Sequence, residues 1–212
     1  MQMIQNIDGI MSKSEFVSEV ENKISSLSET FTLASIDIDS FEAVNSYYGE
    51  YIGDQVLKKI ASVLKQNLKA NDLVCRENKD EFNVLFSNTL SETGFIMMEE
   101  IRKYLEINTF SLGEKDKKKD INIRISVGIA NYPRNAKNAV DLFRAADSAL
   151  FRAKREGKNR VYMAESENMV LKSSYYTKIQ LERLTDLSQK TDKTEAFLLR
   201  EALDDIFDKY SR

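Results

Sequence analysis

Two periodicities alternate along the first three quarters of this chain. Apolar residues recur at helical spacing over roughly 13–26, 41–48, a longer segment after Gly49, 91–105 and 138–155. Runs of strand-forming residues lie between these segments, over 31–39, 73–86, 121–130 and 160–163. Ser12 followed by Glu15 predicts a capping box at the first helix. Because strands alternate with helices around a central antiparallel hairpin, we expect an α/β (α+β) sandwich built on a mixed sheet.

The predicted hairpin at 73–86 carries a polar tip, Glu77-Asn78-Lys79-Asp80. Asparagine tolerates positive φ better than most residues, so Asn78 suits a tight turn at this tip. The 31–39 strand ends in Asp37 and Asp39, which share one face because side chains alternate along a strand. An acidic tip beside an acidic strand end predicts a site for a hard cation of the Mg²⁺ type, with a solvated turn as the alternative.

The composition excludes several classes of catalytic and metal site. The 212 residues include no histidine and one cysteine, Cys75, which excludes Ser-His-Asp catalysis, HExxH zinc sites and an internal disulfide framework. There is no basic, apolar leader and no apolar run near eighteen residues, so we expect a cytoplasmic protein with no membrane partner. The net charge of −3 argues against broad polyanion binding but leaves room for a small DNA-reading surface.

The order of motifs from about Gly9 to Met163 resembles the GGDEF (diguanylate cyclase) family. The matching segments are Asp37–Phe41, Asn45, Tyr48-Gly49, Gly53-Asp54, Arg76–Phe82, Ser126–Ala130 and Ala146–Arg160. The signature is altered, because Asn78 and Lys79 stand where the family has two glycines. The resemblance implies a palm-like fold over 1–164. The apolar pattern lapses after this segment, so we expect a linker at 165–169.

The resemblance also implies a metal site. In the family, metal ligands correspond here to the Asp37 carboxylate, the Ile38 carbonyl and the Asp80 carboxylate, all able to hold Mg²⁺ beside a bound nucleotide. The residues that read guanine correspond to Asn45 and Asp54. An amide and a carboxylate together can pair with the donor and acceptor edge of guanine.

Phosphate and product contacts follow from the same resemblance. The lysines on the phosphate side correspond to Lys154 and Lys158. The inhibitory site that binds cyclic di-GMP corresponds to Lys69 and Asp72, where a lysine replaces an arginine and cannot reproduce its bidentate grip. A polar turn between helix and strand is the alternative interpretation there.

Two parts of the site, the hairpin tip and the position of Glu42, argue against catalysis. A side chain at Asn78 or Lys79 obstructs the close approach of backbone to nucleotide that glycines permit. Glu42 stands where the family has a phosphate-contacting lysine, which reverses the local charge. We therefore expect no catalytic residues and a domain that senses cyclic di-GMP or GTP, or serves as a dimerisation body. A working diguanylate cyclase with a C-terminal oligomerisation tail is the alternative.

The segment 170–212 has a pattern of its own. A strand at 170–176 is expected to precede a helix capped by Thr177 with Gln180, a polar turn at 191–193 and a second helix. This order resembles the ribbon-helix-helix DNA-binding family, although Asp192 replaces the common turn glycine. The resemblance implies a DNA-binding homodimer and a transcription regulator, with a plain helical hairpin for dimerisation as the alternative.

The expected DNA-reading surface is the 170–176 strand. Alternation directs Ser173 and Tyr175 outward if Thr177 caps the helix, and the opposite phase directs Lys172 and Ser174 outward. The start of the second helix at Thr194 offers backbone N–H groups to a phosphate. A third possibility for the whole chain is an interaction module that binds neither nucleotide nor DNA.

Overall fold

The chain divides into two compact units, Met1–Met169 and Val170–Arg212. The structure is a computed structural model that describes residues 10–26, 30–114, 118–164, 174–191, 195, 198, 199, 202, 206, 209 and 210.

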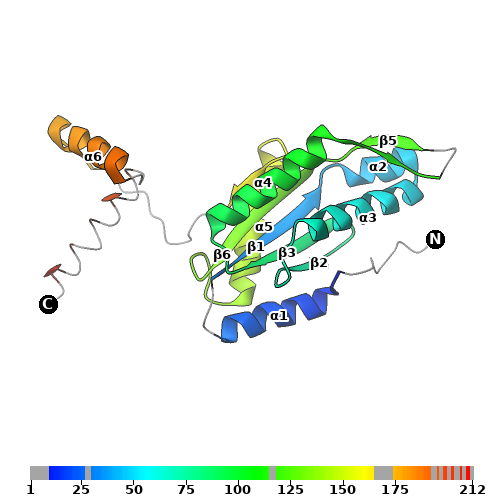
Figure 1. The fold of residues 1–212 in the computed structure, drawn as a ribbon, viewed down its shortest axis with the longest axis horizontal. Coiled ribbons are helices and arrows are strands. Elements are labelled where there is room, and N and C mark those ends of the chain that lie inside the picture. The colour runs from blue at the N-terminus through cyan, green and yellow to red at the C-terminus, as the bar shows by residue number, and fades with distance from the viewer. Residues whose placement is uncertain are drawn as a thin grey trace. The chain divides into compact units, whose positions relative to one another are not determined.

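The first unit holds a succession of helices and strands (Figure 1). In chain order they are α1 (Lys13–Ser25), β1 (Phe31–Ile38), α2 (Phe41–Tyr48), α3 (Glu50–Gln66), β2 (Leu73–Arg76), β3 (Glu81–Ser87), α4 (Ser91–Ile107), β4 (Thr109–Leu112), β5 (Lys119–Asn122), β6 (Ile125–Tyr132), α5 (Ala139–Arg155) and β7 (Val161–Met163). The predicted capping box is confirmed, because Ser12 Oγ accepts the Glu15 N–H at 3.3 Å and Glu15 accepts the Ser12 N–H at 2.9 Å.

Five strands form one mixed sheet in the order β2-β3-β1-β6-β7. β6 and β7 are parallel, and the other neighbours are antiparallel. Asp37 at the end of β1 lies opposite Glu81 on β3 and opposite Ser126 on β6. The predicted mixed-sheet fold class is therefore confirmed, and its register brings the hairpin tip to the end of β1.

Helices cover both faces of this sheet, with α1 on one side and α3 and α4 on the other (Figure 1). Ile36 belongs to the core that β1 shares with α3 and α4, whereas Leu33, on the opposite face of the same strand, belongs to the core shared with α1 and α5. Every residue of β1 is consequently buried. Cys75 is buried in the α1 and α5 core, where burial raises its pKa to about 12, so it remains a neutral thiol.

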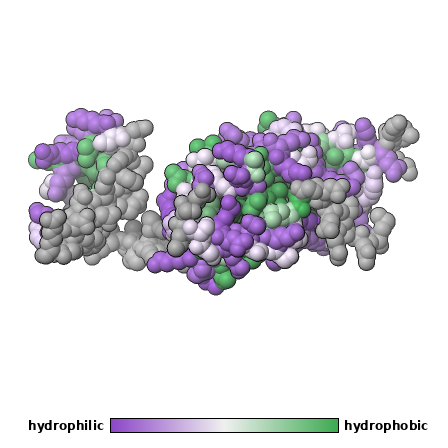
Figure 2. Space-filling view, turned by 60° about the horizontal axis from the view of Figure 1, so that its bottom comes forward, coloured by the Kyte–Doolittle hydropathy of each residue, from purple (hydrophilic) through white to green (hydrophobic). Residues whose placement is uncertain are grey.

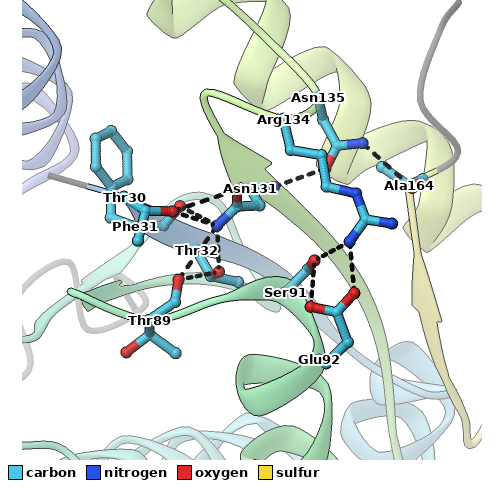
Figure 3. A network of polar contacts seen from close by, with 10 residues as sticks. All are labelled: Thr30, Phe31, Thr32, Thr89, Ser91, Glu92, Asn131, Arg134, Asn135 and Ala164. Carbon is cyan, nitrogen blue, oxygen red and sulfur yellow. Dashed lines mark hydrogen bonds and ion pairs between the residues drawn. The ribbon is translucent and has the colours of Figure 1, made fainter. Parts of the chain in front are cut away.

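A polar network ties the start of β1 to the end of the unit (Figure 3). The buried Asn131 side chain donates to the Phe31 carbonyl and to Thr32 Oγ1, both at 3.0 Å. Its backbone N–H donates to Asn135 Oδ1 at 2.8 Å, and Asn135 Nδ2 reaches the Ala164 carbonyl at 3.4 Å. These bonds satisfy buried polar groups and fix the chain at Ala164, directly after β7.

The strand predicted over 121–130 is wrong as a single element. Its first part is β5, which pairs with β4 in a separate two-stranded sheet, and its second part is β6 in the main sheet. Ile121, Ile123 and Ile125 are all buried, so the alternation of apolar residues continues across the break. Periodicity alone therefore gives no sign of it, and β4 was not predicted.

The expected role of Asn78 at a positive φ is also wrong. Among the described non-glycine residues, positive φ occurs at Ser40, Asn88, Lys158 and Asn159. The hairpin closes with the Glu77 N–H donating to the Glu81 carbonyl at 2.8 Å. The loop over 77–80 is long enough to be built around a type I turn, which needs no left-handed residue.

In the second unit, α6 spans Lys178–Thr191 and its predicted cap is confirmed. Thr177 Oγ1 accepts the Gln180 N–H at 3.3 Å, and Gln180 Oε1 accepts the Thr177 N–H at 2.9 Å. The predicted turn at 191–193 begins too early, because Thr191 is still helical; its other residues lie outside the described ones.

The strand predicted at 170–176 is not formed over 174–176, and 170–173 lies outside the described residues. No strand of the described second unit lies beside 174–176 to pair with it, which is the physical reason. The described residues from 195 to 210 are all helical, in agreement with the second predicted helix. Across the part of the chain that the structure describes, no helix is both long and apolar enough to cross a membrane.

Candidate functional site

The predicted metal ligands come together where the hairpin tip meets the end of β1. The Ile38 N–H donates to the Asp80 carbonyl at 3.2 Å, and Asp37 lies opposite Glu81 in the strand register. Asp37 is almost completely buried, and Asp80 is partly buried. Burial raises the pKa of Asp37 although the nearby Lys154 ammonium opposes the shift, and burial also raises the pKa of Asp80.

Lys154 reaches into this acidic corner from the last turn of α5. Its Nζ lies 2.6 Å from Asp37 Oδ2 and 3.9 Å from Glu81 Oε1. The side chain that the sequence assigns to phosphate binding therefore already neutralises a predicted metal ligand. An incoming divalent cation would compete with Lys154 for the same carboxylate oxygen.

The donor set suits a nucleotide-bound metal better than a resident one. The described residues contain no cluster of three or more His, Cys, Asp or Glu side chains that could hold an ion. The Asp37 and Asp80 carboxylates and the Ile38 carbonyl are hard oxygen donors of the kind that Mg²⁺ takes. Mg²⁺ usually binds through one or two carboxylates together with substrate phosphates and water, so these residues fit it when a nucleotide completes the shell.

Hydrogen bonds close the hairpin tip that carries Asn78 and Lys79. Asn78 Nδ2 donates to Glu81 Oε2 at 2.7 Å. Arg76 donates to two tip carbonyls, from Nε to Asn78 O at 3.0 Å and from Nη2 to Lys79 O at 2.5 Å. The Lys79 side chain is exposed at the tip. The Asn78 side chain is thus bonded within the hairpin.

Arg76 is a site residue to which the sequence assigned no role. Burial lowers its pKa, and the nearby carboxylates of Asp54 and Asp80 act in the opposite direction. Arg76 is thus near both a predicted guanine-reading residue, Asp54, and a predicted metal ligand, Asp80. Its place immediately before the polar tip is the sequence signal that could have identified it.

The predicted guanine-reading residues meet at the junction of α2 and α3. Gly49, at φ 87°, turns the chain between the two helices. Gly53 packs against the Asn45 side chain so closely that a Cβ at Gly53 would overlap Asn45 Oδ1. Among the described side chains, this Oδ1 is a buried atom without a hydrogen-bond partner. Asp54 follows Gly53 on α3, so the amide and carboxylate lie in one region.

A groove of about 990 Å³ borders the hairpin on the α1 and α5 side. Its lining combines apolar Val17, Phe143 and Leu150 with charged and polar side chains. Asn78, Glu81 and Lys154 also line it; Figure 2, which brings the α1 side forward, shows apolar residues among hydrophilic ones on this face.

The second phosphate-side lysine, Lys158, lies in the turn after α5. Its side chain is exposed, and no contact joins it to Asp37 or Lys154 in the described residues. Glu42 is exposed in the first turn of α2.

The residues of the predicted inhibitory site form a turn beside β3. Asp72 accepts the backbone N–H groups of Lys69 and Ser87, both at 2.9 Å. Lys69 is exposed next to a small hollow of about 260 Å³. The Asp72 carboxylate therefore has a structural use, as the polar-turn interpretation expects.

The predicted DNA-reading residues lie mostly outside the described part. Tyr175 is fully exposed, whereas Lys172, Ser173 and Thr194 are outside the described residues. No residue of α6 is buried, although Leu181, Leu184 and Leu187 lie on it.

Comparison with known proteins identifies the first unit. Residues 6–160 match the family described as "Diguanylate cyclase, GGDEF domain". The chain is 33% identical over 138 residues to diguanylate cyclase A of Treponema denticola, which covers 65% of this chain and 36% of that protein. The chain thus spans about a third of the length of the curated relatives that it matches first.

Solved structures give the same result. The GGDEF domain of YfiN (TpbB) from Pseudomonas aeruginosa superposes with a TM-score of 0.70 at 26% identity, covering 75% of this chain and 99% of that one. The GGDEF domain of DgcB from Caulobacter crescentus, in complex with c-di-GMP, gives a TM-score of 0.69 at 27% identity, with 78% and 98% covered. With its sheet order, its hairpin and a family match over most of its length, the chain belongs to the GGDEF domain family.

Proposed function

We propose that the GGDEF domain of this protein binds a guanine nucleotide, GTP or cyclic di-GMP, as a sensor and does not make cyclic di-GMP. The observation that carries the binding is the unpaired Asn45 Oδ1 beside Asp54. A buried acceptor without a donor destabilises a protein by about 1–3 kcal/mol. When the Asn45 amide rotates and pairs with the edge of a guanine, the complex recovers this free energy. The unpaired amide therefore favours binding of a guanine nucleotide.

The phosphates of the nucleotide would lie toward the hairpin. Asp37, the Ile38 carbonyl and Asp80 would hold Mg²⁺ there, and the cation would offset the negative charge of the phosphates. Lys154 and Lys158 would supply further positive charge. Lys154 already lies beside Asp37, so its ammonium group is at the place where the metal would bind. Without the metal, this lysine would contact the phosphates directly.

The tip and its surroundings support the loss of turnover. Asn78 adds a side chain bonded to Glu81 where the family has glycine, and Lys79 adds a long cation beside it. Glu42 adds an anion on the phosphate side. Phosphoryl transfer depends on positioning and on stabilising charge that develops on the transferred group, so all three changes would lower the rate.

An active diguanylate cyclase remains the second candidate. Its support is the retention of Asp37, Asp80, Asn45 and Asp54 at positions where the site can hold GTP and metal. Incubation with GTP separates the two candidates, because only the cyclase yields cyclic di-GMP over many turnovers.

For the second unit we propose a ribbon-helix-helix DNA-binding dimer that makes the whole chain a cytoplasmic transcription regulator. Leu181 and Leu187 are both 46% exposed on α6 in the single chain. A unit of this size buries too little apolar surface alone, so a partner chain is needed to cover them. Pairing of the 170–176 segment with its copy would also satisfy its backbone groups and form a ribbon suited to the major groove.

Selection of bound sequences from random DNA should therefore recover a half-site motif with the full chain. We expect Tyr175→Glu to abolish the enrichment, because it places a negative charge on the proposed ribbon. Tyr47→Glu is the matched control, because Tyr47 is 82% exposed on α2, and it should leave the enrichment unchanged. A monomer in sedimentation, or no enriched sequence at low salt, would refute the proposal.

The second unit carries eight basic and eight acidic residues from Asn168 to Arg212. Its affinity for DNA should consequently depend on few phosphate contacts and fall only gradually with salt.

A further inference from the structure

Asp39 makes contacts that neither the metal site nor the guanine site uses. Its Oδ1 accepts the Ser126 hydroxyl at 2.7 Å, and its Oδ2 accepts the backbone N–H of Asn159 at 2.8 Å. The Asn159 N–H also lies 3.1 Å from Ser126 Oγ. One carboxylate therefore joins the end of β1 to β6 and to the turn that follows α5.

That turn has an uncommon backbone conformation. Gly157, Lys158 and Asn159 take φ values of 117°, 62° and 49° in succession. The left-handed region is unfavourable for lysine, which carries a Cβ and has no short polar side chain to bond locally. Two adjacent non-glycine residues in this region need support from their surroundings, and Asp39 supplies a charged acceptor at this point.

The Asn159 side chain is held from the other direction by α4. Its Nδ2 donates to Glu106 Oε1 at 2.6 Å, and its Oδ1 accepts from Arg102 Nη1 at 3.0 Å. Arg102 is itself buried and paired with Glu99 and Glu106. Asn159 is thus fixed through both its backbone and its side chain. It thereby also fixes the position of its neighbour Lys158.

We propose that Asp39 is a positioning residue, which holds the 157–159 turn so that Lys158 is presented to the phosphates of the bound nucleotide. The inference rests on the proposed function, because it assumes that a guanine nucleotide binds with its phosphates near Lys158. Asp39 itself does not touch the nucleotide and acts through the Asn159 amide.

Ligands with and without phosphates separate a positioning role of Asp39 from a role in folding. Loss of the Asp39 carboxylate should weaken binding of GTP about tenfold, the loss of one charged contact. Binding of guanosine, which has no phosphates, should change less than about twofold on the same reasoning. A merely structural role would weaken both ligands equally or neither.

The test uses the full chain and the variant Asp39→Ala, with calorimetry against GTP and guanosine at a temperature at which every protein is folded. Asp141→Asn is the control, because the Asp141 carboxylate likewise accepts two hydrogen bonds, from Asn138 and Arg144, but at the start of α5. It should bind both ligands like wild type.

Amide hydrogen exchange at Asn159 in the nucleotide-free protein provides a second measurement. We expect Asp39→Ala to lose protection there at least tenfold, and Asp141→Asn to keep it. If wild type binds neither ligand, the proposed function fails, and this exchange rate alone decides the structural part of the inference. Unchanged protection, or equal losses for GTP and guanosine, would overturn the role of Asp39.

Discussion

Gly53→Ala is expected to lower the affinity for GTP at least tenfold while the domain stays folded. A Cβ at this position would overlap Asn45 Oδ1 and lie 2.9 Å from Asn45 Cγ. The obstructing group is the end of a side chain, so it can rotate away at small expense to stability. The Asn45 amide, which we propose reads guanine, then leaves its position, and the loss of its hydrogen bonds amounts to roughly 1.5–3 kcal/mol.

Calorimetric titration with GTP measures this change, and a thermal melt verifies that the variant is folded. Gly94→Ala serves as the control, because its Cβ would meet the Thr32 side chain far from Asn45 and Asp54 along the chain. It should bind GTP as wild type does. If Gly53→Ala also binds GTP with unchanged affinity, Asn45 does not read the base.

Gly128→Ala is expected to have the largest effect on stability, a loss of about 3 kcal/mol or more. A Cβ on β6 would overlap the Ala146 carbonyl oxygen and the Leu150 N–H and lie 2.8 Å from Leu150 Cα. These atoms belong to the backbone of α5, which packs on both β1 and β6 and cannot rotate away. Urea denaturation at constant temperature gives the free energy of unfolding.

Gly94→Ala is again the matched control for Gly128→Ala. Its Cβ would lie 2.7 Å from Thr32 Cγ2, a side-chain atom, so part of the overlap can relax. We expect a loss of about 1 kcal/mol, at the low end for overpacking. Equal losses in the two variants would contradict the close contact between β6 and α5.

Local patterns predicted most of the secondary structure. The helices and the hairpin follow from spacing, and the caps at Ser12 and Thr177 follow from residues three apart. The break between β5 and β6 was missed because apolar residues alternate through it. The 170–176 strand could not be verified within one chain, because a strand needs a neighbour and local propensity does not provide it.

The sequence predicted which residues come together at the candidate site, but not which side chains contact one another there. Asp37, Asp80 and the tip came from spacing and resemblance, and the register brings them together. The pairing of Lys154 with Asp37 spans 117 residues, and that of Asn159 with Asp39 spans 120. Contacts at such separation arise from packing of α5 on the sheet, and no local pattern carries them.

A gain of cyclase activity in a variant changed at the tip and at Glu42 is a complementary prediction. The variant Asn78→Gly/Lys79→Gly/Glu42→Lys carries, at these three positions, the residues that the resemblance to the family implies. If those positions alone prevent turnover, this protein should form cyclic di-GMP where wild type does not.

The most direct measurement incubates the purified full chain with GTP and Mg²⁺ or Mn²⁺, follows product by chromatography, and titrates the same sample with GTP by calorimetry. The account predicts saturable GTP binding, lost in Asp54→Ala, with no cyclic di-GMP formed. Formation of cyclic di-GMP over many turnovers, or no binding at millimolar GTP, would contradict it.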